Sequence, residues 1–85
     1  MDNTEKSLVR SLQRGLQIIN VVAAEGPLHV KRIARTVRLP LPTAYHLLRT
    51  LVHDDYLIRL DDGSYVLGDR FRIDALQHCH ELAGA

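Results

Sequence analysis

The sequence predicts a mainly helical domain in which three helices are followed by a two-stranded hairpin. Apolar residues recur at helical spacing in three successive stretches, which begin near residues 11, 29 and 41. The period changes at residues 56–67, where residues that favour strands flank Asp62-Gly63, a pair typical of hairpin turns. With 85 residues and 46% hydrophobic content, the chain has room for one small core.

The first expected helix begins at Ser11, whose hydroxyl suits the cap of a first turn, and ends at Gly26 and Pro27. We expect its apolar stripe to face the core. The stripe comprises Leu12, Leu16, Ile19 and Ala23, and it is widened by Ile18 and Val22. Gly15 lies inside this helix at a cost of up to about 1 kcal/mol relative to alanine, for which a close helix contact is the usual compensation.

The second expected helix begins at His29, just after Leu28, which is expected to add a very short strand. Its buried side comprises Ile33, Ala34 and Val37, and its outward side comprises Lys31, Arg32, Arg35 and Thr36. A turn of three residues, Arg38 to Pro40, leads to the third helix near Leu41 or Pro42. Two helices joined so tightly form a helix-turn-helix.

The third expected helix combines a buried stripe with an unusual outward face. The stripe consists of Ala44, Leu47, Leu48 and Leu51. The opposite arc carries Pro42, Tyr45, His46, Arg49 and His53, with Thr43 and Thr50 on its flank. This face is rich in donors and has no carboxylate, which suits the major groove of DNA, where helices contact base edges. The alternative is an amphipathic helix whose polar side is only solvated.

The hairpin is predicted from strands at residues 56–60 and 64–67, with Tyr65 and Leu67 on the inner face. A hairpin in this position is a wing, so the predicted fold class is a winged helix-turn-helix. A final helix is expected from Gly68 or Asp69, with an apolar side of Phe71, Ala75, Leu76 and Cys79. We expect it to lead into another domain or to lie against a partner chain.

Charge is distributed unevenly along the chain, although the formal net charge is only +1. Residues 27–53 hold five of the 11 Lys and Arg residues and none of the 10 Asp and Glu residues. Residues 54–85 hold seven of the acids and three arginines. A basic block in a near-neutral chain indicates a face that meets phosphate, with a solvated basic patch as the alternative.

Several classes of protein are disfavoured. Cys79 is the only cysteine, so no intramolecular disulfide can form and a reduced cytosol is the better fit. No apolar run approaches the roughly 18 residues of a membrane span, and the polar start does not resemble a signal peptide. We therefore expect a soluble cytoplasmic chain that does not bind a membrane.

Enzymatic, metal and cofactor functions are also not expected. Asp54 and Asp55 are adjacent carboxylates that point in different directions and have no nucleophile or base placed beside them. His78, Cys79 and His80 are consecutive, so on a helix their side chains diverge by about 100° and do not readily close one metal site.

Several segments, in order and at matching spacing, resemble the N-terminal domain of IclR-type bacterial transcriptional regulators. Together they cover about residues 9 to 70. They are Ser11-Leu12-x-Arg14-Gly15-Leu16-x-Ile18, Gly26-Pro27-Leu28, Ile33-Ala34, Leu39-Pro40, Thr43-Ala44-Tyr45-x-Leu47-Leu48-x-Thr50-Leu51, Tyr56-Leu57 and Gly63-x-Tyr65-x-Leu67-Gly68.

The resemblance implies a DNA-binding domain that works as a homodimer and precedes a linker helix and an effector-binding domain. It divides the chain into a flexible arm at residues 1–8, a winged helix-turn-helix at 9–68 and the start of the linker helix at 69–85. The small-molecule effector would then act only through a domain that this chain lacks. The implied location is the bacterial cytoplasm, in association with the nucleoid.

Two positions depart from the family pattern. Members commonly have small polar or basic residues where this chain has Leu41 and Pro42, so a phosphate contact is expected to be lost or replaced by apolar contact with a thymine methyl. The wing tip carries Asp61 and Asp62, whose carboxylates are repelled by phosphate. We therefore expect this wing to contribute little beyond Arg59.

These observations together predict double-stranded DNA binding, with the third helix in the major groove. The expected base or groove contacts are Leu41, Pro42, Thr43, Tyr45, His46 and Arg49. The expected backbone contacts are Arg14, Lys31, Arg32, Arg35, Arg38 and Arg59. Because one module makes few contacts, a dimer on a palindromic operator is expected. The alternative function is a winged-helix module for protein interaction, which would bind no nucleic acid.

Overall fold

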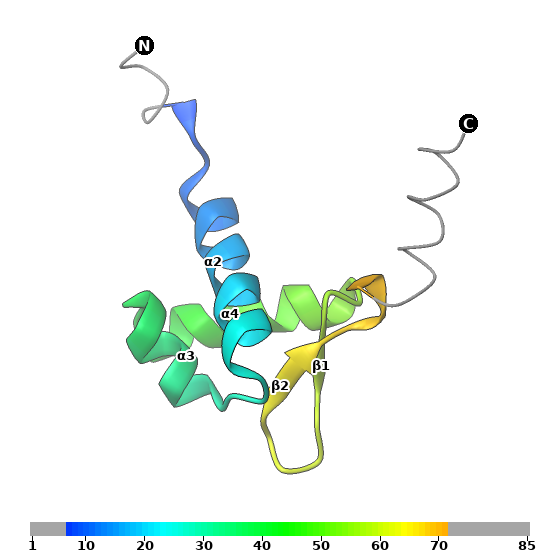
Figure 1. The fold of residues 1–85 in the computed structure, drawn as a ribbon. Coiled ribbons are helices and arrows are strands. Elements are labelled where there is room, and N and C mark those ends of the chain that lie inside the picture. The colour runs from blue at the N-terminus through cyan, green and yellow to red at the C-terminus, as the bar shows by residue number, and fades with distance from the viewer. Residues whose placement is uncertain (1–6, 72–85) are drawn as a thin grey trace, which may run out of the picture.

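A computed structural model describes residues 7–71 of the chain. Three helices, α2 (Arg10–Glu25), α3 (Val30–Val37) and α4 (Leu41–His53), precede an antiparallel hairpin of β1 (Leu57–Arg59) and β2 (Tyr65–Leu67) (Figure 1). A single 3-10 turn, η1 (Asp69–Phe71), follows the hairpin. This order of elements confirms the predicted fold class, which is a mainly helical winged helix-turn-helix.

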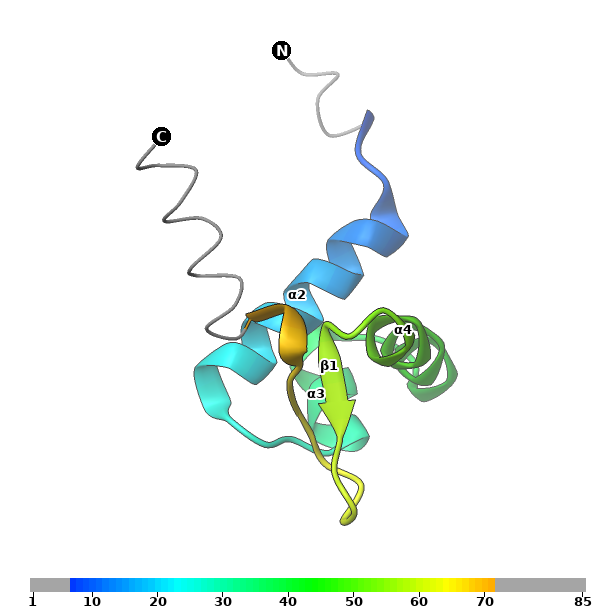
Figure 2. The same cartoon turned by 90° about the vertical axis from the view of Figure 1, so that its right-hand side faces the viewer.

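The core lies where the three helices meet the hairpin. Ile18 of α2 and Ile33 of α3 are completely buried, and Leu48 of α4 and Leu57 of β1 are each only 1% exposed. The remaining buried apolar residues are Val22, Leu28, Val30, Ala34, Val37, Ala44 and Tyr65. Figure 2 shows α4 beside β1, with which it is in contact. Every helix therefore contributes to one core that sets the orientation of α4.

Helix α2 differs from the prediction at its start and in the face that it buries. It begins at Arg10 with Val9 as the N-cap residue and has no side-chain cap, so the predicted Ser11 cap is wrong. Ile18 and Val22 face the core, but Leu12 and Leu16 are 61% and 51% exposed. The helix carries two apolar arcs that are roughly one residue's rotation apart. Packing against α3 and the hairpin selects the arc that was predicted only to widen the stripe.

The turn between α3 and α4 confirms the predicted helix-turn-helix. His29 is the N-cap residue of α3, and Arg38 ends the helix in the left-handed conformation with a φ of 62°. The N–H of Leu39 then donates to the carbonyl of Ala34 at 2.8 Å. Helix α4 starts at Leu41, so Pro42 occupies its second position, where a missing N–H costs no helical hydrogen bond.

The hairpin has the expected turn but shorter strands than predicted. Its register pairs Leu57 with Leu67, and the left-handed φ of +90° at the turn falls on Gly63. Tyr56 is not in β1, since its N–H donates to the carbonyl of Leu51 at the end of α4. The strand predicted at Leu28 is a single bridge to Tyr65, closed by hydrogen bonds of 3.1 and 2.7 Å. This bridge joins the wing to the segment between α2 and α3.

Beyond the hairpin the chain crosses close to the end of α4. A Cβ on Gly68 would collide with the carbonyl oxygen of Asp55, so no larger residue fits at this crossing. The Phe71 ring packs edge-on against Tyr56 at 5.8 Å between centroids. The predicted final helix, with Ala75, Leu76 and Cys79, lies outside the described residues, as does most of the predicted arm at residues 1–8. Among residues 7–71, no helix has the length and apolar character to cross a membrane.

Candidate nucleic-acid interface

All six predicted groove contacts lie on exposed positions of α4. These residues are Leu41, Pro42, Thr43, Tyr45, His46 and Arg49. Beneath them Ala44 is completely buried and Leu48 is 1% exposed, so the core anchors the opposite side of the helix. The Tyr45 ring is 44% exposed. The outward face is therefore accessible to a ligand and is held at a fixed orientation by the core.

The start of α4 is electropositive because of its backbone. Its first turn contains no acidic residue and its N-cap residue is Pro40. Neither Pro40 nor Pro42 has an N–H, so the amides of Leu41 and Thr43 are the donors that helix geometry leaves without an intrahelical acceptor. The aligned peptide dipoles favour negative charge at this end. The two amides can therefore donate to a phosphate or to an acceptor on a base.

A hollow of about 270 Å³ separates α4 from the wing. Tyr45 and Arg49 of α4 and Arg59 of β1 are its exposed members, and Leu48, Val52 and Tyr65 complete the lining. No carboxylate is part of this lining. The structure thus brings Arg49 and Arg59, from different elements, to one cavity that can accept a negatively charged group.

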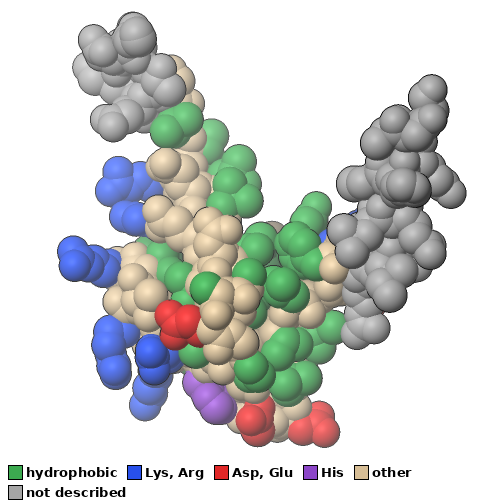
Figure 3. Space-filling view, in the orientation of Figure 1, with side chains coloured by type: hydrophobic (Ala, Val, Ile, Leu, Met, Phe, Trp, Pro, Cys, Tyr) green, Lys and Arg blue, Asp and Glu red, His purple; other side chains and the backbone are tan. Residues whose placement is uncertain are grey.

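Helix α3 presents a basic surface next to the turn. Lys31, Arg32 and Arg35 are exposed, and Figure 3 shows Lys and Arg side chains gathered on one side of the molecule. Arg32 forms an ion pair with Glu25 at 3.2 Å, with both side chains still largely exposed. A surface pair of this kind contributes little to stability, but it neutralises part of the charge of Arg32. Lys31 and Arg35 are therefore the stronger phosphate candidates on this helix.

A second hollow, of about 370 Å³, brings Arg14 together with Arg38. Arg14 lies on α2 and Arg38 ends α3, and the polar residues Gln17, Asn20 and Thr36 line the space between them. The Arg14 guanidinium donates to the side-chain oxygen of Gln17 at 3.2 Å. Arg14 was predicted as a backbone contact, but its place beside Arg38 could not be predicted from the order of residues along the chain.

The carboxylate of Asp62 at the wing tip makes hydrogen bonds that the sequence analysis did not predict. Asp62 accepts hydrogen bonds from the backbone N–H of Ser64 at 2.9 Å and from the Ser64 hydroxyl at 2.6 Å. These bonds hold the pKa of Asp62 below its ordinary value. A ring nitrogen of His29 lies 3.1 Å from the Asp62 carbonyl oxygen and joins the tip to the start of α3. Asp62 is therefore a structural part of the turn.

Replacing Ser64 by alanine should raise the pKa of Asp62 toward its ordinary value, because the hydroxyl bond is the largest cause of the lowered pKa. A lowered folded-state pKa contributes stability that is present above the unfolded-state value and is lost as the pH falls through the folded-state value. The variant should therefore lose less stability than the parent on acidification below pH 4. An NMR titration of the Asp62 carboxyl tests this directly, and an unchanged pKa would contradict it.

The clusters of titratable side chains considered from the sequence lie partly inside the described part of the chain. Within residues 7–71, no group of three His, Cys, Asp or Glu side chains is placed to hold a metal ion. His78, Cys79 and His80 lie outside these residues. The Asp54 carboxylate lies 2.9 Å from Nδ1 of His53 at the end of α4, in exposed surroundings. A base therefore does lie beside Asp54, contrary to the expectation from the sequence, although both side chains are largely exposed.

Comparison with known proteins identifies the family. A family model described as the IclR helix-turn-helix domain matches residues 11–61. The chain belongs to the IclR family. This IclR-family domain is accordingly a DNA-binding domain of a transcriptional regulator, and the resemblance noted in the sequence is confirmed.

Two similar solved structures agree with this assignment. One is an IclR-family transcriptional regulator from Brucella abortus, with a TM-score of 0.73 and 29% identity over 95% of this chain and 30% of that protein. The other is HmgR of Pseudomonas aeruginosa, with a TM-score of 0.68, 24% identity and coverage of 86% and 29%, which supports the fold alone. The chain therefore spans less than a third of either protein. None of the curated proteins matches it significantly.

Proposed function

We propose that this IclR-family domain binds a specific double-stranded operator with α4 in the major groove. One observation carries the proposal. The exposed donor face of α4 adjoins a hollow that holds two arginines and no carboxylate. Major-groove binding requires a helix with this combination of donors and positive charge, since base edges and phosphates are both within reach.

The side chains divide by the part of DNA that they reach. Thr43, Tyr45, His46 and Arg49 contact base edges or adjacent phosphates, and Leu41 and Pro42 offer apolar contact to a thymine methyl. Phosphates are held by Lys31, Arg35 and Arg38 with smaller contributions from Arg14 and Arg32. Such contacts set the register on the duplex without reading sequence. Arg59, rather than the acidic tip, is the wing's backbone contact.

We further infer that the regulator acts as a homodimer on a palindromic operator. A single small module makes few base contacts, and two modules related by a two-fold axis bind half-sites spaced by whole helical turns. We assign residues 9–68 to the DNA-binding unit and 69–85 to the start of a linker helix. A small-molecule effector would act through a separate domain, in a regulator that works on the bacterial nucleoid.

The rival function is protein interaction without nucleic acid. The segregation of charge argues against it, because Lys31, Arg35 and Arg38 are exposed along α3 and at its C-terminal end. A protein partner has no general need for a basic surface of this kind, whereas a polyanion does. Salt dependence separates the two functions, since only phosphate binding releases condensed counterions.

Replacing Lys31 and Arg35 together by alanine should flatten the salt dependence of DNA binding. Each lost phosphate contact lowers the slope of log K against log salt by about 1, so the double variant should lose about 2. Fluorescence anisotropy with a labelled random duplex at several salt concentrations measures the slope. Arg70→Gln is the matched control, because Arg70 contacts the carbonyl of Asp54 at the opposite end of α4.

Binding by the parent chain without any salt dependence would contradict the proposal and favour the protein-interaction module. Selection of bound duplexes from a random pool then tests specificity and symmetry together. Recovery of one palindromic motif is expected. Recovery of unrelated sequences would show that the domain binds DNA without the proposed base recognition.

A further inference from the structure

His29 joins the wing to the start of α3. Its Nε2 atom lies 3.1 Å from the backbone carbonyl oxygen of Asp62 in the wing turn, although the two residues are 33 positions apart along the chain. A carbonyl oxygen can only accept a hydrogen bond, so the Nε2 atom carries the proton and donates. His29 is also the N-cap residue of α3. The bond therefore fixes the tip of the hairpin relative to the first helix of the helix-turn-helix.

Strand β2 is attached to the same segment through its backbone. The N–H of Leu28 donates to the carbonyl of Tyr65 at 3.1 Å, and the N–H of Tyr65 donates to the carbonyl of Leu28 at 2.7 Å. Figure 1 shows the segment between α2 and α3 passing beside β2. The turn at residues 60–64 lies beyond this bridge. Because an isolated hairpin with strands of three residues is marginally stable at best, the position of its turn depends on contacts with the rest of the domain.

The Arg59 guanidinium lies on the side of the turn where the His29 ring lies. A Cβ built on Gly63 would be 3.6 Å from Nη2 of Arg59 and 3.8 Å from Cδ2 of His29. Gly63 has a left-handed φ of +90°, which residues with a side chain rarely adopt. The ring and the guanidinium therefore share one space beside the turn, and the place of the ring determines the space that remains for Arg59.

We propose that His29 is a positioning residue for DNA binding, which holds the Arg59 guanidinium where the wing meets the phosphate backbone. Arg59 also lines the hollow beside Arg49 of α4, so its position determines whether one duplex can contact both arginines. Without the bond from His29 the turn moves relative to α3, and ordering it again on DNA lowers the affinity. The inference rests on the proposed function, in which Arg59 is the backbone contact of the wing.

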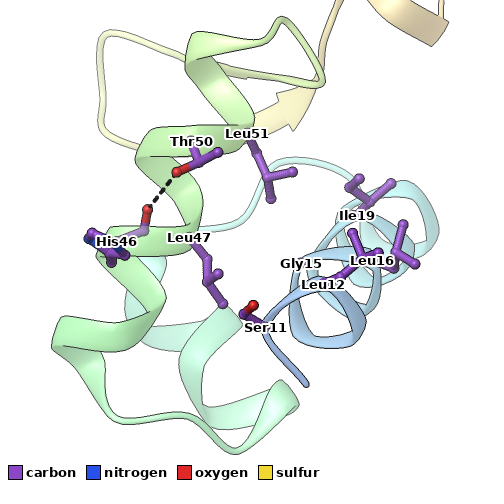
Figure 4. A pocket seen from close by; sticks show the side chains of 9 residues that line it. All are labelled: Ser11, Leu12, Gly15, Leu16, Ile19, His46, Leu47, Thr50 and Leu51. Atoms are coloured by element: carbon purple, nitrogen blue, oxygen red, sulfur yellow. Dashed lines mark hydrogen bonds between the residues drawn. The ribbon is translucent and has the colours of Figure 1, made fainter. Parts of the chain in front are cut away.

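His29 acts on a different surface from His46, which is a predicted groove contact. His46 lies on α4 and lines a groove of about 390 Å³ between α2 and α4, where Figure 4 shows it one turn before Thr50. The lining of that groove includes neither His29 nor Arg59. Substitution of His29 therefore leaves the outward face of α4 unchanged, and its effect on DNA binding reports on the wing.

Two substitutions separate the hydrogen bond from the bulk of the ring. His29→Gln keeps an N–H donor, whereas His29→Phe keeps a ring beside Gly63 and has no donor. His29 is exposed, so both variants should fold, which circular dichroism checks. In anisotropy titrations with a random duplex at fixed pH and salt concentration, His29→Phe should bind about threefold to tenfold more weakly than the parent. His29→Gln should stay within about twofold of the parent, because the donor is retained.

A double-mutant cycle with Arg59→Ala tests whether His29 acts through Arg59. In the Arg59→Ala background, His29→Phe should cause no further loss of affinity, because the guanidinium that the bond positions is absent. A general structural role for His29 would instead lower the affinity by the same factor in both backgrounds. Leu60→Gln is the matched control on the wing, since its side chain is 37% exposed and takes part in neither contact of His29. It should leave the affinity unchanged.

Equal affinity of the parent and His29→Phe would overturn the inference, as would equal losses in the two backgrounds. The heteronuclear NOE of the Gly63 amide gives a readout without DNA, and it should fall in His29→Phe but not in His29→Gln. An unchanged NOE in His29→Phe would also contradict the positioning role. Salt-dependent binding by the parent in these cases would leave the proposed function intact. A parent chain that binds no duplex would overturn both.

Discussion

Replacing Ile33 by alanine is expected to lower the free energy of unfolding by about 2 to 5 kcal/mol. Ile33 is completely buried in the core, where α3 meets α2 and α4. The truncation removes apolar contacts and leaves a cavity that close-packed neighbours fill only in part. Domains of this size are stable by only about 5 to 15 kcal/mol, so the variant should lose a large fraction of its free energy of unfolding. Urea denaturation followed by circular dichroism measures the change.

The control for Ile33→Ala is Lys31→Ala, since Lys31 lies on the same helix and its side chain is exposed. Its free energy of unfolding should change by no more than about 0.5 kcal/mol. The pair separates burial from any general sensitivity of α3 to substitution. A change below about 1 kcal/mol for Ile33→Ala would contradict the core position of α3 and, with it, the anchoring of the helix-turn-helix.

Replacing Arg49 by alanine is expected to weaken operator binding by about 1 to 3 kcal/mol, or roughly 5-fold to 150-fold. Arg49 lies on the outward face of α4 and lines the hollow shared with Arg59. A guanidinium there can donate two hydrogen bonds to a guanine edge, which is the commonest specific contact in the major groove. Anisotropy titrations at one fixed salt concentration, with the operator and with a random duplex, measure the effect.

Loss of specificity is the decisive part of the Arg49 result. The ratio of operator to random binding should fall, whereas Lys31→Ala removes the same charge and should leave that ratio nearly unchanged. Equal weakening on both duplexes would assign Arg49 to the DNA backbone. We choose Arg49 over His46 for this test because His46 also lines the groove between α2 and α4, so its replacement would affect two surfaces.

Much of the helix-turn-helix was predictable because its signals are local. The positive φ of Gly26 ends α2, the turn runs from Arg38 to Pro40, and Ile33 is buried in α3, all as the spacing of apolar and turn residues indicated. The exposed face of α4 follows from the same helical periodicity. Each of these features depends on residues only a few positions apart, and their period and stereochemistry do not require knowledge of the rest of the fold.

The orientation of α2 was not predictable, because its sequence offers two apolar arcs. Periodicity ranks both as suitable for a core, and only the shape of α3 and the hairpin decides that Ile18 and Val22 turn inward. Leu12 and Leu16 are consequently exposed beside Gly15. The exposure of Leu12 and Leu16 could therefore not be predicted from a pattern that also fits a buried stripe.

The sequence by itself determined the order of the elements, the tight turn and the residues that α4 presents outward. Only the tertiary structure decided which distant residues become neighbours, such as Arg49 with Arg59 and Arg14 with Arg38. It also decided that a ring nitrogen of His29, at the start of α3, lies 3.1 Å from the carbonyl oxygen of Asp62 in the wing turn. The physical reason is the separation of the residues along the chain. Local periodicity arises from backbone geometry, whereas contacts between distant residues arise from the packing of whole elements around one core.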